Sequence, residues 1–355
     1  MTKHRLMLSA AAAALLAALT AAHADTEISN STGTALDTTT SGNITIDSTG
    51  GVGVQTATSP AVTINSNAFL LNNGFISNTG TDSAVGILID TTNGSIQAPS
   101  TGFASTGTID LSGGGSSKKG IWITGGNTFY GPITLTSLTT TDITGAVVGA
   151  TQSSSLILQG DSSAAFYLQQ GTTVTSNVLI GGGGIIMNPA NAQTASGSVM
   201  VLLDGTVNGN FINASAISGT GPGLTGIEAL GGIHSCASDT SAPSGFTCPT
   251  SSGGSFINAG SISLIGLSFP NARGNNPEAG SAVVIGGNVD GGFVNGGPST
   301  STNVAASTIS SAGIIANGTV SPTVLIDPSR ALDAVTQLPR GPAILGPVPV
   351  DVDPN

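Results

Sequence analysis

A nine-residue phrase occurs twice in this chain, at residues 205–213 (GTVNGNFIN) and again at residues 287–295 (GNVDGGFVN). A shorter copy, GSFIN, lies between them at residues 254–258. Self-similarity of this kind in a chain rich in Gly, Ser, Thr and Asn is typical of a solenoid, in which each coil buries its apolar side only by stacking on the next coil. The sequence therefore predicts a scaffold of stacked coils.

Short apolar runs rich in β-branched residues recur between Gly, Asn and Ser residues, as expected for β-strands. The clearest runs are 44–46, 85–89, 121–123, 156–158, 199–203 and 283–285. After the N-terminal leader, no segment has the apolar spacing of a helix. The predicted fold class is all-β, a parallel β-helix (β-solenoid) with Ile, Val, Leu and Phe pointing inward and Gly or Asn at the corners.

A β-sandwich is the competing fold, because Asn-Gly pairs that suit hairpin turns occur at 73–74, 93–94 and 317–318. We favour the solenoid because of the repeats. A looser template, polar-x-Gly/Ser-x-Ile, begins at Asn72 and again at Thr92, which suggests coils of about 20 to 25 residues. With strands about 4.8 Å apart, the chain would then form a rod on the order of 60 Å long. Asn at equivalent corners predicts a hydrogen-bonded ladder along this rod.

Residues 1–24 have the features of a signal peptide: basic residues near the start, an apolar run to Leu19 and a small-residue cleavage site at Ala22-His23-Ala24. We therefore expect export of a chain that begins at Asp25. Residues 25–338 form the predicted β-solenoid domain. The last segment, 339–355, contains five prolines and is predicted to be an extended linker or a truncated end.

Charge excludes one class of partner. Without the leader, five basic residues face 18 acidic ones, a formal net charge of −13. Nucleic acid is not expected to bind, because phosphate contacts need a concentrated basic face. Only 7% of the residues are charged, against about 25% in ordinary globular domains, so the surface must consist largely of hydroxyls and amides. The 39% apolar content argues against disorder.

Cys236 and Cys248 flank a turn-rich polar insert. The phrase Phe-Ile/Val-Asn recurs 45 residues apart across this insert and 37 residues apart after it, so the extra length predicts a loop. We expect a disulfide to close it in an oxidising compartment, which contributes about 3 kcal/mol in the chain-entropy model. A metal site that also uses His234 is the alternative, disfavoured because no Cys-x-x-Cys pair repeats.

Two carboxylates are the best candidates for catalysis. Asp90 and Asp110 lie 20 residues apart, so coils of that length would stack them as an acid/base pair or as ligands of one Ca²⁺ ion. We favour the plainer interpretation that each caps a turn, because no aromatic cluster or basic residue accompanies the pair. His234 is the only histidine after the leader, and no Gly-x-Ser-x-Gly motif supports a serine nucleophile. No catalytic, cofactor-binding or metal-binding residue is predicted.

The densest aromatic group comprises Trp122, Phe129 and Tyr130, close in sequence to Lys118 and Lys119. It would suit a ligand patch. Packing in the core or under a cap is the more common role of such residues, and we favour that role here.

The leader, the Gly/Ser/Thr/Asn-rich coils and the phrases Gly-x-Val-x-Gly-x-Phe-Ile/Val-Asn and SAVVIGG (281–287) resemble the passenger regions of autotransporters of Gram-negative bacteria. The resemblance implies a right-handed β-helix, in agreement with the general preference of parallel crossovers. It implies passage through the periplasm to the cell surface or the extracellular space. The membrane β-barrel that ends this family has no counterpart here, so we expect an outer-membrane translocator in cis beyond this chain or in trans.

The expected function is that of a non-enzymatic passenger with a role in adhesion or contact. Its partners would be surface molecules of a host or neighbouring cell, or a polysaccharide. Two alternatives stay open: a polysaccharide lyase or hydrolase that uses the Asp90 and Asp110 face of a β-helix groove, and a purely structural export stalk.

Overall fold

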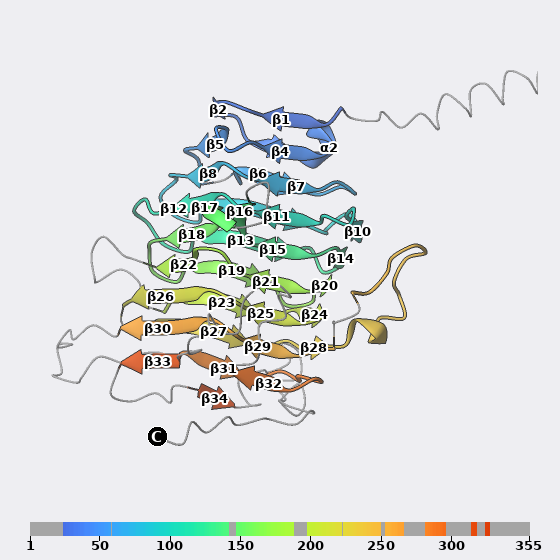
Figure 1. Ribbon diagram of the computed structural model, residues 1–355, viewed down its shortest axis with the longest axis vertical. Coiled ribbons are helices and arrows are strands. Elements are labelled where there is room, and N and C mark those ends of the chain that lie inside the picture. The colour runs from blue at the N-terminus through green and yellow to red at the C-terminus, as the bar shows by residue number, and fades with distance from the viewer. Residues whose placement is uncertain are drawn as a thin grey trace, which may run out of the picture.

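The computed structural model describes residues 24–57, 59–141, 147–187, 197–221, 223–249, 253–265, 281–295, 314–317 and 324–326. In this part the chain forms a parallel β-helix, with coils stacked in chain order from the blue N-terminal end to the red C-terminal end of Figure 1. The predicted fold class is therefore confirmed. Most of the predicted leader (residues 1–23) and the Pro-rich segment 339–355 lie outside the described residues.

Four parallel sheets form the walls of the helix, three with nine strands and one with five. Sheet 1 comprises β1 (Thr26–Ile28), β4 (Ile44–Ile46), β7 (Leu70–Asn72), β11 (Phe103–Ser105), β15 (Ile133–Leu135), β21 (Val178–Ile180), β25 (Phe211–Asn213), β29 (Phe256–Asn258) and β32 (Phe293–Asn295). Sheet 2 comprises β2 (Ser31–Thr32), β5 (Gly51–Val54), β8 (Phe75–Asn78), β12 (Thr108–Leu111), β18 (Ser155–Leu158), β22 (Gly184–Met187), β26 (Ala216–Thr220), β30 (Ser261–Ile265) and β33 (Ile314–Asn317).

Sheet 3 comprises β3 (Leu36–Asp37), β6 (Val62–Ile64), β9 (Val85–Asp90), β13 (Lys119–Thr124), β19 (Ala164–Leu168), β23 (Val199–Leu203), β27 (Thr225–Ala229), β31 (Val283–Ile285) and β34 (Val324–Ile326). Sheet 4 is shorter and comprises β10 (Ile96–Gln97), β14 (Thr128–Tyr130), β20 (Thr173–Thr175), β24 (Thr206–Asn208) and β28 (Ile233–His234). The chain passes through sheets 1, 2 and 3 in each coil, and from β10 to β28 it adds a strand of sheet 4 before returning to sheet 1.

Two other elements interrupt this order. The single described turn of α-helix, α2 (Thr38–Ser41), occupies the corner after β3 and is capped by Asp37, whose side chain accepts a hydrogen bond from the Thr39 amide. An antiparallel hairpin, β16 (Ser137–Thr141) with β17 (Val147–Ser153), projects between β15 and β18. It is the one antiparallel pair among the described strands, so the sandwich alternative is wrong. The pairs Asn73-Gly74 and Asn93-Gly94 turn corners between strands of different sheets.

The repeated phrases lie directly on top of one another. Strand pairing places Phe211 against Phe256 and Phe256 against Phe293, with ring centroids 5.2 Å apart at both steps. Buried aliphatic and aromatic residues from all four sheets continue this stack as one core. The coaxial stacking that the repeats predict is confirmed.

The predicted asparagine ladder is also present. The Asn213 side-chain amide donates to the Asn258 carbonyl oxygen, and the Asn258 amide donates to that of Asn295, both at 2.7 Å. Asn213 and Asn258 are fully buried. A buried amide without a partner would cost about 1 to 3 kcal/mol, so stacking identical residues is what makes this polar position tolerable.

The expected coil length is wrong. Equivalent residues are 18 positions apart in the first coil (Asp25 and Asn43), 33 apart between Asn72 and Ser105, and 45 apart between Asn213 and Asn258. Coils lengthen because sheet 4, the hairpin and corner loops are added while the strands stay short. Nine levels about 4.8 Å apart give a rod of roughly 40 Å, shorter than expected.

Glycine is required where the coils approach most closely, at the corner between sheets 1 and 2. A Cβ atom on Gly107 would lie 2.0 Å from the Gly74 carbonyl oxygen, and one on Gly74 would lie 2.2 Å from that of Gly50. These glycines occupy the same corner in successive coils. Any larger residue would push backbone against backbone.

We predict that Gly107→Ala lowers the free energy of unfolding by about 1 to 3 kcal/mol, because the added methyl group separates two coils. Gly114→Ala is the matched control, since a Cβ there would meet no heavy atom within 4 Å. Denaturant unfolding followed by circular dichroism measures both. Equal midpoints for the two variants would contradict the close-approach argument.

Candidate functional site

A column of polar side chains runs along the edge of sheet 4. The last residues of β14, β20, β24 and β28 are in register: Tyr130, Thr175, Asn208 and His234. The Asn208 amide donates to the Thr175 hydroxyl at 3.3 Å. Parallel pairing thus brings together polar groups from four coils that are far apart in the sequence.

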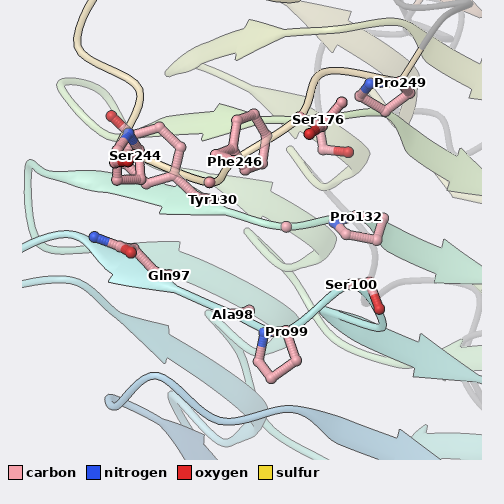
Figure 2. A pocket seen from close by; sticks show the side chains of 14 residues that line it. Gln97, Ala98, Pro99, Ser100, Tyr130, Pro132, Ser176, Ser244, Phe246 and Pro249 are labelled. Carbon is pink, nitrogen blue, oxygen red and sulfur yellow. The ribbon is translucent and has the colours of Figure 1, made fainter.

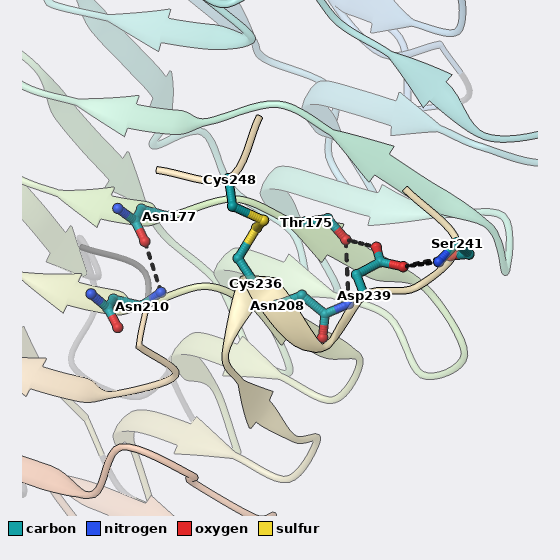
Figure 3. Close-up of a disulfide and its surroundings, with 8 residues drawn as sticks. All are labelled: Thr175, Asn177, Asn208, Asn210, Cys236, Asp239, Ser241 and Cys248. Atoms are coloured by element: carbon teal, nitrogen blue, oxygen red, sulfur yellow. Dashed lines mark hydrogen bonds between the residues drawn. A yellow bond between two sulfur atoms is a disulfide. The ribbon is translucent and has the colours of Figure 1, made fainter. Parts of the chain in front are cut away.

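The disulfide loop docks against this column. After β28 the chain forms the short 3-10 helix η1 (Cys236–Ser238) and then folds back toward the N-terminal coils (Figures 1 and 3). Cys236 is buried and forms a disulfide with Cys248, with Cα atoms 5.8 Å apart. The Tyr130 hydroxyl donates to the Ser241 carbonyl oxygen at 3.1 Å, across 111 residues of sequence. The loop therefore contacts coils that precede its own by several turns.

Asp239 is the anchor of the loop (Figure 3). Its carboxylate accepts hydrogen bonds from the Thr175 hydroxyl at 2.7 Å, the Ser241 amide at 2.9 Å and the Ser241 hydroxyl at 2.6 Å. Burial acts to raise the pKa of Asp239, but hydrogen bonds from Ser241, Thr175 and Asn208 outweigh it and hold the pKa below its ordinary value. The ionised form is thus the one that docks.

A groove of about 530 Å³ lies between the loop and the corners that follow β10 and β14 (Figure 2). Tyr130 and Phe246 meet edge to face at its centre, with ring centroids 5.3 Å apart. Four prolines stiffen the walls, and hydroxyl and amide groups supply the polarity. The lining residues are Gln97, Ala98, Pro99, Ser100, Tyr130, Gly131, Pro132, Ser176, Pro243, Ser244, Gly245, Phe246, Thr247 and Pro249. None of these 14 residues is acidic, basic, histidine or cysteine.

The structure separates Asp90 from Asp110. Asp90 ends β9 in sheet 3 and pairs with Thr124, whereas Asp110 lies in β12 of sheet 2, between Ser77 and Ile157. The expected stack is wrong because these coils advance by 33 or 34 residues rather than 20. Each carboxylate accepts a hydrogen bond from the amide two residues ahead, at 2.9 Å for Asp90 and 2.8 Å for Asp110. Both therefore cap turns, which is the interpretation that the sequence favoured.

His234 pairs with a carboxylate but not, in the described structure, with a nucleophile. Its Nδ1 lies 3.1 Å from Asp290 Oδ2, and its Nε2 edge packs over Gly232. The metal alternative loses its thiolates, because both cysteine sulfurs are bonded to each other. Within the described ranges, no group of three or more His, Cys, Asp or Glu side chains is arranged to hold a metal ion.

The aromatic trio does not form one patch. Phe129 is fully buried in the core, Tyr130 lines the groove, and Trp122 lies on the outer face of sheet 3. Alternation along a strand and the corner between β13 and β14 send the three rings in different directions. Sequence proximity gave no signal for the contact between Tyr130 and the disulfide loop.

Comparisons with known proteins give no match to this chain among family models, curated proteins or solved structures. Function must therefore be inferred from the residues themselves. As for membrane spans, the described helices are all too short to cross a bilayer.

We predict that the disulfide loop loosens as the pH falls below about 4, the ordinary pKa of an aspartate. A depressed pKa in the docked state contributes stability that is present above the unfolded-state pKa and is lost as the pH falls through the folded-state pKa. Amide-exchange protection of residues 237–247, corrected for intrinsic rates at each pH, measures the effect. Asp239→Asn should lower protection at neutral pH and remove its acid dependence.

Asp82→Asn is the control for this experiment, because Asp82 accepts a hydrogen bond from the Ser116 amide in a different part of the helix. It should leave the protection profile of the loop unchanged. A profile that keeps its acid dependence in Asp239→Asn would show that another group anchors the loop.

Proposed function

We propose that the protein is an exported, non-enzymatic β-helix with a role in adhesion or contact at the cell surface, and that the loop-covered groove is its recognition site. One observation carries the proposal. The groove has a size typical of ligand sites, yet its walls hold no acid, base or thiol that would transfer a proton or attack a substrate. Such walls suit binding.

The chemistry of the walls describes the partner. Pro and aromatic rings offer rigid apolar area, and neighbouring hydroxyl and amide groups offer hydrogen bonds without charge. A rigid site loses little conformational entropy when it binds. We propose that the partner is an uncharged segment of a surface molecule or polysaccharide of a host or neighbouring cell.

Export is supported by the sequence of the leader and by the disulfide, which persists in oxidising compartments. Together with the repeats, these features support an autotransporter-type passenger that crosses the periplasm and reaches the cell surface or the medium through an outer-membrane translocator, in cis or in trans.

Two other functions have weaker support. A lyase or hydrolase at Asp90 and Asp110 would need the two carboxylates to face one substrate, and they lie on different sheets. A purely structural stalk would not need a loop that folds back over several coils to build a lined groove.

The test is the adhesion of bacteria that display the mature chain, compared with cells that carry the leader alone. We predict that Phe246→Ala lowers the number of adhering cells about tenfold, because central aromatic residues of an interface are commonly worth more than 1.4 kcal/mol. Phe75→Ala is the matched control, since Phe75 is 41% exposed on sheet 2 and lies outside the groove. It should adhere within about twofold of the unaltered chain.

Equal adhesion by cells with and without the displayed chain would exclude a contact role. Equal loss in both phenylalanine variants would remove the groove as the recognition site. Surface immunodetection and circular dichroism establish that each variant is displayed and folded.

A further inference from the structure

A second surface feature lies on the outer face of sheet 3. Leu88, Trp122, Tyr167 and Leu202 occupy successive outward positions in register on β9, β13, β19 and β23. The Trp122 and Tyr167 rings are nearly parallel, with an interplanar angle of 10° and centroids 6.5 Å apart. Both side chains are partly exposed. This row of rings therefore lies outside the core of the helix.

A cation is held beside the row. The Lys119 ammonium lies 4.8 Å from the centroid of the Trp122 ring and donates to the Ser117 carbonyl oxygen at 3.3 Å. Burial lowers the pKa of Lys119, and no neighbouring carboxylate acts to raise it. Lys119 thus presents a positive charge without an acidic partner among the described residues.

This charge is unusual for the chain. The described ranges contain only one other lysine or arginine, Lys118, which is fully buried and whose ammonium donates to the carbonyl oxygens of Leu111 and Gly113. In a protein with 18 acidic residues, the outer face of sheet 3 is where the described surface offers a cation to a ligand.

A small cleft of about 140 Å³ adjoins the ammonium. Lys119 and Tyr167 form one side, and Ser162, Ser163 and Leu202 contribute to the rest of the lining. The opposite ends of these strands are acidic, because Asp90 ends β9 and Asp204 follows β23. Burial raises the pKa of Tyr167, and the charge of Asp204 adds to this effect. The face is therefore polar along the strands, with its positive end at the cleft.

We infer that this face binds an anionic saccharide, with the sugar ring against Trp122 and Tyr167 and its carboxylate or sulfate paired with Lys119 at the cleft. The electron-rich faces of aromatic rings attract the positively polarised C–H groups of a pyranose. An ammonium without a carboxylate partner gains a charge-assisted hydrogen bond from the anion. This site deepens the proposed contact function, but it uses a different sheet and a different class of ligand from the groove.

Trp122 is the only tryptophan of the chain, so its fluorescence reports directly on this site. The experiment titrates the mature chain with trigalacturonate, with a sulfated galactose disaccharide, and with the neutral methyl ester of trigalacturonate. We expect a saturable change in Trp122 emission with at least one anionic probe, weakening as salt rises from 0.05 to 0.5 M, and at least tenfold weaker binding of the neutral ester. The carboxylate and sulfate arms distinguish the two sources of negative charge.

Variants separate the parts of the site. Lys119→Gln should weaken binding of the anionic probe about tenfold, Lys119→Arg should restore most of it, and Tyr167→Ala should weaken it similarly. Because Lys119 also contacts the reporter ring, calorimetry repeats these titrations without fluorescence. Phe246→Ala should bind the probe like the unaltered chain, since Phe246 lines the groove.

Failure of either anionic probe to bind, equal binding of the neutral ester, or full affinity in Lys119→Gln would overturn this inference. None of these results bears on adhesion through the groove, which is measured with Phe246→Ala and Phe75→Ala. The two proposals therefore fail separately.

Discussion

Hydrogen-bonded register between successive coils is the constraint on which the rest of this structure depends. Most strands have only two to six residues, so none is stable alone, and each is fixed by the strands above and below it. The register decides which side chains meet. It places Phe256 between two other phenylalanines and Asn258 between two other asparagines, and a slip by one residue would turn both outward.

The same register builds both candidate binding surfaces. Tyr130 and Thr175 are neighbours because β14 pairs with β20, and Trp122 and Tyr167 are neighbours because β13 pairs with β19. Extra residues enter at corners, where they lengthen a coil without shifting its strands. The disulfide loop is the clearest example, because it adds length before β29 and yet leaves Phe211 in register with Phe256.

Features encoded by local patterns were predictable from the sequence. The repeated phrase gave the parallel fold, the phenylalanine stack and the asparagine ladder, and the spacing across Cys236 and Cys248 indicated a closed loop. Features that depend on coil length were not predictable. Coils vary from 18 to 45 residues, so the interval of 20 between Asp90 and Asp110 had no structural meaning. The groove was missed because Tyr130 and Ser241 are 111 residues apart and share no pattern.

Scarcity of charge gives the two surfaces different selectivities. The groove is built from neutral groups and its covering loop is anchored by Asp239 through uncharged donors, so salt should affect ligand binding there weakly. The face of sheet 3 has one half-buried ammonium, so binding there depends on an anion. Trp122 and Tyr130 belong to consecutive strands of one coil, β13 and β14, which fixes the distance between the surfaces. A ligand long enough to reach around this corner would bind at the second surface with a raised effective concentration, because no flexible linker lies between them.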